Sequence, residues 1–281
     1  MLARMSMQLL EKGGYEPRKA DYACWVNSCV VSDDVVGAVE ALIEIQGRGV
    51  NLLEASEEQC GGTWKGGLAM QYTIAMSLGR SIRRLDNVYF ALVDLVRNDF
   101  KVPPLILNAV IMAAGQTGHV DRAFATFGEY ESLFGSVPDK HAYNALLWSV
   151  AKTRGPRLPM DTLFNVLQDM EDSGFSPDGK SFSTMLEAMC LTNGTMEDNA
   201  NVHGLGDILQ HIENEGMSVD SRGLRRAAMA AAEVGDEDTS AQAVKLLEMQ
   251  DGKHNVPDFF YTRLKEINVQ ASKSSSSSSS K

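Results

Sequence analysis

Apolar residues recur three and four positions apart along most of the chain, which is the spacing that gives a helix one apolar face. The segment 120–134 has this pattern most clearly, with apolar residues at Val120, Ala123, Phe124, Phe127, Tyr130 and Phe134. A shorter apolar stretch at 107–114 precedes it and ends at Gly115–Gly118, where glycine readily terminates a helix. Strand-like alternation is scarce, so the pattern predicts an all-α protein built from pairs of helices.

The helix pairs repeat along the chain. Two predicted units end in a Pro-Asp dipeptide, at Pro138-Asp139 and Pro177-Asp178, and Val219-Asp220 and Pro257-Asp258 hold equivalent places. The units are about 35 to 42 residues long, a period typical of helical-repeat proteins. The clearest predicted units are 104–139, 140–178, 179–220 and 221–258, and looser units are predicted at 19–53 and 68–103.

The segments outside these units are predicted to have other structures. Residues 1–18 resemble only the second helix of a unit, so we expect the chain to be a fragment of a longer protein. A Gly/Glu-rich insert at Glu54–Gly67 separates the two looser units, and the extra residues of two longer units fall near Arg154–Pro159 and Thr195–His203. A short helix is predicted at 259–269. The serine-rich tail 270–281 has nothing to bury and is predicted to be disordered.

A single pair of amphipathic helices cannot bury both of its apolar stripes. Stacked neighbours bury each other's stripes, and the product is an α-α superhelix with a concave binding face. We expect the first helix of each pair to line that face.

The best-preserved unit resembles the pentatricopeptide repeat. The sequence AYNALLWSVAK, followed by DTLFNVLQDMEDSGFSPD, places Tyr143-Asn144, Met170, Gly174 and Pro177-Asp178 where the consensus of that family has Tyr-Asn, Met and Gly-x-x-Pro-Asp. The resemblance covers about 19–258 and is strongest over 104–178. It implies a right-handed solenoid of helix-turn-helix repeats.

The resemblance also implies binding of single-stranded RNA at one base per repeat. In the family, the fifth residue of a repeat and the last residue before the next repeat read the base edge. The corresponding pairs are Asn108 with Asp139, Asn144 with Asp178, and Ser183 with Asp220. By this resemblance the two Asn/Asp pairs prefer uracil and the Ser/Asp pair prefers guanine, which gives a UUG-like preference.

The chemistry of these residue types agrees with such a role. An asparagine amide offers both a donor and an acceptor to the Watson–Crick edge of a pyrimidine, and an aspartate behind it can hold its orientation. The family places an aliphatic residue at the second position to sandwich the base. Leu105 fits that position, whereas His141 departs from it and offers a ring for stacking, and Lys180 departs as well. Thr73 is the equivalent reader of 68–103, but its partner position is a proline, so we expect no base reading there.

Composition narrows the function further. The net charge of −11 argues against a broad nonspecific grip on phosphates, which relies on Lys and Arg. The four cysteines form no CxxC pair, and Cys24 and Cys29 have no second ligand pair at zinc-finger spacing, so we predict reduced thiols and no metal site. P-loop, GxSxG, HExxH and deaminase-type zinc signatures are absent, so we predict no enzyme and no cofactor.

Simpler interpretations of the same residues stay open. Asp139, Asp178 and Asp220 each precede a helix and suit ordinary N-caps, a role compatible with base reading. Asn108 and Asn144 also suit a solvated first turn. Two basic clusters suit either phosphate binding or charge matching at a helix end. They are Arg80, Arg83 and Arg84, and Arg222, Arg225 and Arg226.

Two functions therefore compete. The first is an RNA-binding adaptor in organelle RNA processing, stability or translation, with single-stranded RNA as its partner. Its place in a mitochondrion or chloroplast follows from the family resemblance alone. The alternative is a protein-interaction scaffold or a structural component of an organellar ribonucleoprotein, which the net charge of −11 favours.

Overall fold

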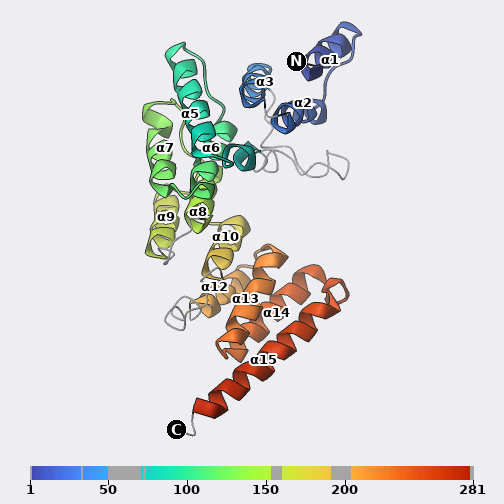
Figure 1. The fold of residues 1–281 in the computed structure, drawn as a ribbon, viewed down its shortest axis with the longest axis vertical. Coiled ribbons are helices and arrows are strands. Elements are labelled where there is room, and N and C mark those ends of the chain that lie inside the picture. Colours follow the sequence, from blue (N-terminus) through green and yellow to red (C-terminus); the bar gives the residue numbers. More distant parts are fainter. Residues whose placement is uncertain are drawn as a thin grey trace. The chain divides into compact units, whose positions relative to one another are not determined.

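The computed structural model describes residues 2–32, 34–49, 71, 74–152, 160–190 and 204–278. All regular structure in these ranges is helical, with no strand, as the spacing of apolar residues predicts (Figure 1). The chain divides into two compact units, residues 1–153 and 154–281, which are described separately. None of the described helices is both long enough and apolar enough to cross a lipid bilayer.

The first unit contains helix pairs whose partners lie next to each other in sequence. Its helices are α1 (Leu2–Lys12), α2 (Lys19–Val31), α3 (Val35–Gly47), α5 (Ile82–Arg97), α6 (Pro104–Gln116), α7 (Val120–Ser132) and α8 (Lys140–Lys152), and residues 74–78 are also helical. Helix α2 packs on α3, and α6 packs on α7. Helix α8 begins the next pair and packs on both α6 and α7, so consecutive pairs stack on one another.

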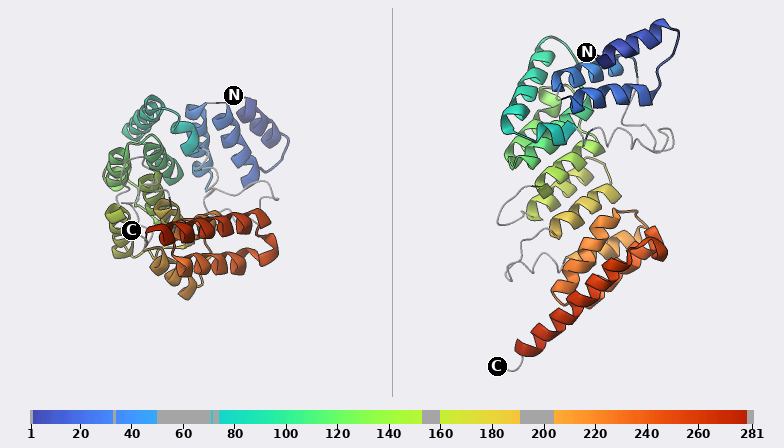
Figure 2. Two further views of the ribbon diagram at one scale, coloured as in Figure 1. Left: turned by 60° about the horizontal axis from the view of Figure 1, so that its bottom comes forward. Right: turned by 45° about the vertical axis from the view of Figure 1, so that its right-hand side comes forward.

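The second unit repeats this arrangement. Its helices are α9 (Met160–Asp172), α10 (Gly179–Met189), α12 (Leu205–Asn214), α13 (Ser221–Glu233), α14 (Glu237–Asp251), the 3-10 turn η2 (Lys253–Asn255) and α15 (Asp258–Ser278). First helices stack on first helices, α10 on α13 and α13 on α15, while α12 stacks on α14. Figure 2 shows α13, α14 and α15, in orange to red, side by side. The core between them contains Leu186, Leu209, Leu224, Leu247 and Phe260.

The second helices of several pairs end in the same way. After α7, Gly135 has φ +63° and the Ser136 N–H donates to the Tyr130 carbonyl at 3.0 Å. After α9, Gly174 has φ +85° and the Phe175 N–H donates to the Met170 carbonyl at 3.0 Å. Such a left-handed residue closes the helix and turns the chain toward the next pair.

Polar contacts connect neighbouring pairs at the surface. Between α5 and α7, Arg122 pairs with Asp86, and the Tyr89 hydroxyl donates to Glu129 at 2.5 Å. In the second unit, Lys245 on α14 pairs with Glu213 on α12 at 2.5 Å, and Arg226 on α13 pairs with Glu187 on α10 at 2.8 Å. Because these groups are partly exposed, the pairs contribute little to stability, and the apolar core carries most of the stacking energy.

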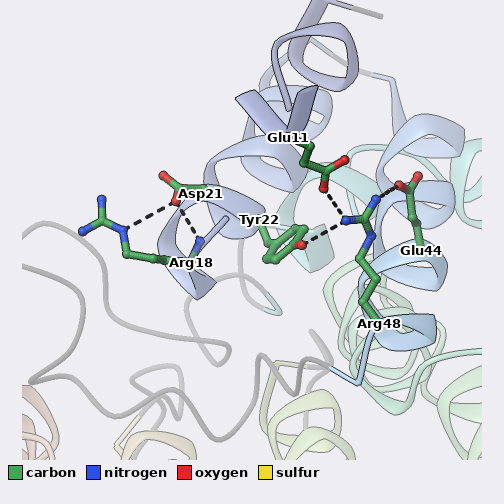
Figure 3. A network of polar contacts seen from close by, with 6 residues as sticks. All are labelled: Glu11, Arg18, Asp21, Tyr22, Glu44 and Arg48. Carbon is green, nitrogen blue, oxygen red and sulfur yellow. Dashed lines mark hydrogen bonds and ion pairs between the residues drawn. The ribbon is translucent and has the colours of Figure 1, made fainter. Parts of the chain in front are cut away.

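An arginine holds the first helices of the chain together (Figure 3). The Arg48 guanidinium pairs with Glu11 of α1 and donates to Glu44 of α3 at 2.8 Å and to the Tyr22 hydroxyl of α2 at 3.3 Å. Next to it, Asp21 accepts the Arg18 backbone N–H at 2.9 Å. These contacts join α1 to the pair α2–α3, so the predicted N-terminal segment 1–18 has a structural role.

The C-terminal boundary differs from the prediction. Helix α15 runs from Asp258 to Ser278, nine residues past the predicted end at 269, so the prediction of a disordered tail is wrong for 270–278. The serines follow the helix without a glycine or proline to stop it. Residues 279–281, the insert Glu54–Gly67, Thr73 and the turns Arg154–Pro159 and Thr195–His203 lie outside the described residues.

Candidate nucleic-acid interface

The aspartates predicted to read bases lie directly before first helices. Asp178 precedes α10, and its Oδ1 accepts the backbone N–H groups of Lys180 at 3.0 Å and Ser181 at 3.1 Å. The Ser181 hydroxyl accepts the Asp178 N–H at 3.1 Å in return, so the two residues form a reciprocal capping box. The capping role of Asp178 is therefore confirmed.

The other two aspartates are held in the same way. Asp139 accepts the Ala142 N–H at 2.9 Å before α8, and Asp220 accepts the Arg222 N–H at 3.1 Å before α13. A carboxylate in this place satisfies backbone donors of the first turn and favours the positive end of the helix dipole. Capping therefore fixes where each carboxylate sits, at the same end of each first helix.

The predicted pair Ser183 and Asp220 meets in the structure. The Asp220 backbone N–H donates to the Ser183 hydroxyl oxygen at 2.8 Å, although the two residues lie 37 positions apart. The Ser183 hydroxyl in turn donates to the Gly179 carbonyl at 2.5 Å. Ser183 is half-buried on α10, and Asp220 is exposed. One repeat's fifth position and the residue before the next repeat thus form a single junction.

A glycine permits this junction to close. A Cβ added to Gly179 would lie 1.8 Å from the carbonyl oxygen of Ser218, far inside van der Waals contact. The segment that leads into α13 therefore passes directly against the first residue of α10. Any larger residue at position 179 would push the two repeats apart at the place where Ser183 and Asp220 meet.

Asn108 is placed differently from Ser183. It is 0% exposed, and its Oδ1 accepts the Tyr130 hydroxyl of α7 at 3.0 Å. Its Nδ2 is buried without a hydrogen-bond partner, which costs about 1–3 kcal/mol in a protein interior. Leu105, predicted to sandwich a base, is 4% exposed and belongs to the same interior. The expectation that these two side chains face an open groove is not met, because α7 and α8 cover this part of α6.

Tyr130 is the residue of this region that the sequence pattern missed. Its apolar spacing indicated a core residue, and it is fully buried, but its hydroxyl reaches Asn108 and lies 3.3 Å from the Pro104 carbonyl. Burial, together with the nearby negative charge of Asp139, raises the pKa of Tyr130 far above its ordinary value. The phenol therefore keeps its proton, and Asn108, Tyr130 and Asp139 form one neighbourhood.

The remaining predicted residues lie on α8 and in the basic clusters. Asn144 and His141 are half-buried on α8. Asn144 belongs to the first unit and its predicted partner Asp178 to the second. In the basic clusters, Arg84 donates to the Ser77 carbonyl at 3.2 Å, which makes it a helix-packing residue.

Metal ligands do not converge in the described part of the chain. No group of three or more His, Cys, Asp or Glu side chains there is placed to hold an ion. Cys24 is exposed and Cys29 is buried. Burial of the Cys190 thiol raises its pKa to about 12, which keeps it protonated and unreactive at neutral pH.

The stacked helix pairs define the class: a helical-repeat solenoid, an α-α superhelix of the type predicted. No family model matches the chain. A mitochondrial pentatricopeptide repeat-containing protein of Arabidopsis thaliana is 30% identical over 110 residues, which are 39% of this chain and 17% of that protein. The chain thus matches less than a fifth of the length of this relative.

Two solved structures share the fold. Maize pentatricopeptide repeat protein PPR10 superposes with a TM-score of 0.55 at 16% identity, over 96% of this chain and 34% of PPR10. PPR10 in complex with an 18-nucleotide psaJ RNA element gives a TM-score of 0.51 at 17% identity, over 96% of this chain and 35% of PPR10. The chain therefore has the pentatricopeptide repeat fold and shares sequence with a protein of that family, which confirms the predicted resemblance.

Proposed function

We propose that this chain binds single-stranded RNA along its first helices and acts as an adaptor in organelle RNA processing, stability or translation. The observation that carries the proposal is the junction of Ser183 and Asp220, where two predicted base-reading residues meet across 37 positions of sequence. Support also comes from the fold, which PPR10 has in its complex with RNA. No catalytic step is part of the proposal.

The junction has suitable chemistry for base recognition. Ser183 offers a hydroxyl, and Asp220 offers an exposed carboxylate that can accept from the N–H groups of a guanine edge. The capping bond from Arg222 and the bond from its own N–H to Ser183 limit the freedom of Asp220. A reader fixed before the ligand arrives loses less entropy when it binds.

The proposed readers are the pair Ser183 and Asp220 for guanine, and the pair Asn144 and Asp178 for uracil, with His141 stacking on a base. The net charge of −11 leaves little electrostatic attraction for phosphates. Affinity then comes mainly from base edges and stacking, and it falls only weakly as salt rises.

The test is fluorescence anisotropy with short A-rich RNAs that contain the triplet UUG or its reverse, GUU, at two salt concentrations. We expect binding of one orientation, and a three- to tenfold loss when guanine is replaced, which is the worth of about one hydrogen bond. Ser183→Asn should move the preference at that position from guanine to uracil. The same substitution at the exposed Ser132, at the end of α7, is the matched control and should change nothing.

Failure of the chain to bind any of these RNAs at low salt would refute the proposal. It would support the second function, a protein-interaction scaffold or structural part of an organellar ribonucleoprotein. The observations that favour this alternative are the net charge of −11 and the burial of Asn108 and Leu105.

A location in an organelle, mitochondrion or chloroplast, is part of the first proposal. Its support is the similarity to the Arabidopsis protein, which is a mitochondrial one. The test is the distribution of the tagged full-length protein between purified mitochondria, chloroplasts and cytosol. Recovery in the cytosol alone would contradict an organellar role.

A further inference from the structure

The Tyr130 hydroxyl donates a hydrogen bond to Asn108, a predicted base reader that is buried, and this contact changes what the repeat 104–139 can do. We propose that Tyr130 silences base reading by the α6–α7 pair, so that the chain discriminates no nucleotide at the position assigned to Asn108. This proposal rests on the proposed RNA binding. It makes Tyr130 a specificity-determining residue, because the chain would recognise one base fewer than its predicted readers imply.

The first argument is the position of Tyr130 in the repeat. Its carbonyl accepts the N–H that closes α7, from Ser136 at 3.0 Å. Carbonyls that accept the same closing bond in other second helices belong to Leu95, Met170 and Ile212, all without a side-chain polar group. A hydroxyl at this position distinguishes α7 from these other described second helices, and it lies where it can reach the first helix of the same pair.

The second argument is the hydrogen bonding of the Asn108 amide. Reading a pyrimidine edge uses both the oxygen and the nitrogen of an amide. Here Tyr130 occupies Oδ1 at 3.0 Å, and Nδ2 is buried with no partner. Reversing the amide would not help, because a single hydroxyl can serve one of the two atoms and would leave the other unpaired. A base therefore finds neither atom accessible.

The third argument is the contrast with the pair α10–α12. Ser183 occupies the same repeat position on α10, but it bonds to the backbone of Asp220 and stays half-buried. Asn108 bonds instead within its own pair and is 0% exposed. The contact of Ser183 therefore lies at the boundary between two repeats and is partly exposed, whereas the contact of Asn108 lies within one repeat and is buried.

The test varies the first nucleotide of the triplet, using UUG, AUG, CUG and GUG in A-rich RNA with the purified chain. Wild-type affinities should agree within about twofold across these four, while replacing the final guanine should weaken binding three- to tenfold. Tyr130→Phe keeps the ring and removes the hydroxyl, and Tyr130→Met installs the residue found at position 170. Both should create a three- to tenfold preference for uracil at the first nucleotide.

The controls separate this proposal from the proposed function. Tyr261→Phe removes a hydroxyl that bonds to Glu248 at 2.7 Å on α14, remote in sequence from the readers, and should alter no preference. A wild-type chain that already discriminates the first nucleotide, and loses this on Asn108→Ala, would overturn the silencing. The silencing would also be overturned if both Tyr130 variants bound the four RNAs with equal affinity. In that case, discrimination of the final guanine would show that the chain still reads RNA bases. Absence of all RNA binding would refute the proposed function and this proposal together.

Discussion

Two glycines, one inside α7 and one just after its end, should respond in opposite directions to the same substitution. Gly128 is an exposed residue in the interior of α7, and a Cβ added there would meet nothing within 4 Å. Gly135 follows the end of α7, is also exposed, and would also meet nothing within 4 Å, but its φ is +63°. Because neither alanine would clash, the backbone conformation alone decides the outcome.

The magnitudes follow from these two conformations. Gly128→Ala should stabilise the protein by about 1 kcal/mol, the difference in helix propensity between glycine and alanine. Gly135→Ala forces an alanine into the left-handed region at a cost of about 1–2 kcal/mol, offset by about 0.4–1 kcal/mol from the stiffer unfolded chain. The net result is a destabilisation of about 1 kcal/mol, so the two variants should differ by about 2 kcal/mol.

Urea unfolding followed by circular dichroism measures both effects as shifts of the midpoint at unchanged slope. Thermal unfolding should move by about 2–4 °C upward for Gly128→Ala and downward for Gly135→Ala. Shifts of the same sign in the two variants would refute the assignment of Gly135 to a left-handed helix end. A double variant with nearly unchanged stability would support the additivity expected for two separate sites.

Further outcomes follow from single contacts. Gly179→Ala should destabilise the second unit by about 1–3 kcal/mol, because the new methyl would overlap the Ser218 carbonyl, and unchanged stability would contradict that approach. Leu209→Ala, at a fully buried core position, should cost about 2–5 kcal/mol in urea unfolding, and a loss below 1 kcal/mol would mean that the core is not packed as described. Burial, with the hydrogen bond to Glu129, raises the pKa of Tyr89 to about 12 from its ordinary value of 10. Folding therefore favours the neutral phenol, a contribution fully present below pH 10 and lost as pH rises through 12. Stability should fall less steeply between these pH values in Tyr89→Phe, and identical slopes would exclude the linkage.

Local signals predicted the helices well. The pair α6 and α7 lies inside the predicted unit 104–139, because apolar spacing and the glycines at 115–118 and 135 act through neighbouring residues alone. The same locality explains the error at the C-terminus. Composition argued for a disordered serine tail, whereas α15 continues to Ser278 because no residue there breaks a helix.

The sequence also indicated which residues would meet at one junction. The repeat spacing and the family resemblance paired Ser183 with Asp220, and the structure brings them to 2.8 Å. Their proximity depends on the length of one repeat, which the sequence records directly, and base reading by the pair stays a prediction. The capping of α10 by Asp178 was likewise readable, since a cap involves residues within one turn.

The burial and hydrogen bonding of Asn108 could not be predicted from the sequence. Its residue type and repeat position are those of a base reader, and Tyr130 has the spacing of a core residue. Which of them faces the groove depends on how α7 crosses α6 and on whether a hydroxyl comes within hydrogen-bond distance of the amide. The sequence by itself determined the helices, their pairing and the repeat, because these follow from short-range periodicity. Only the tertiary structure decided that Tyr130 hydrogen-bonds to Asn108, because that contact depends on the packing of two helices in three dimensions.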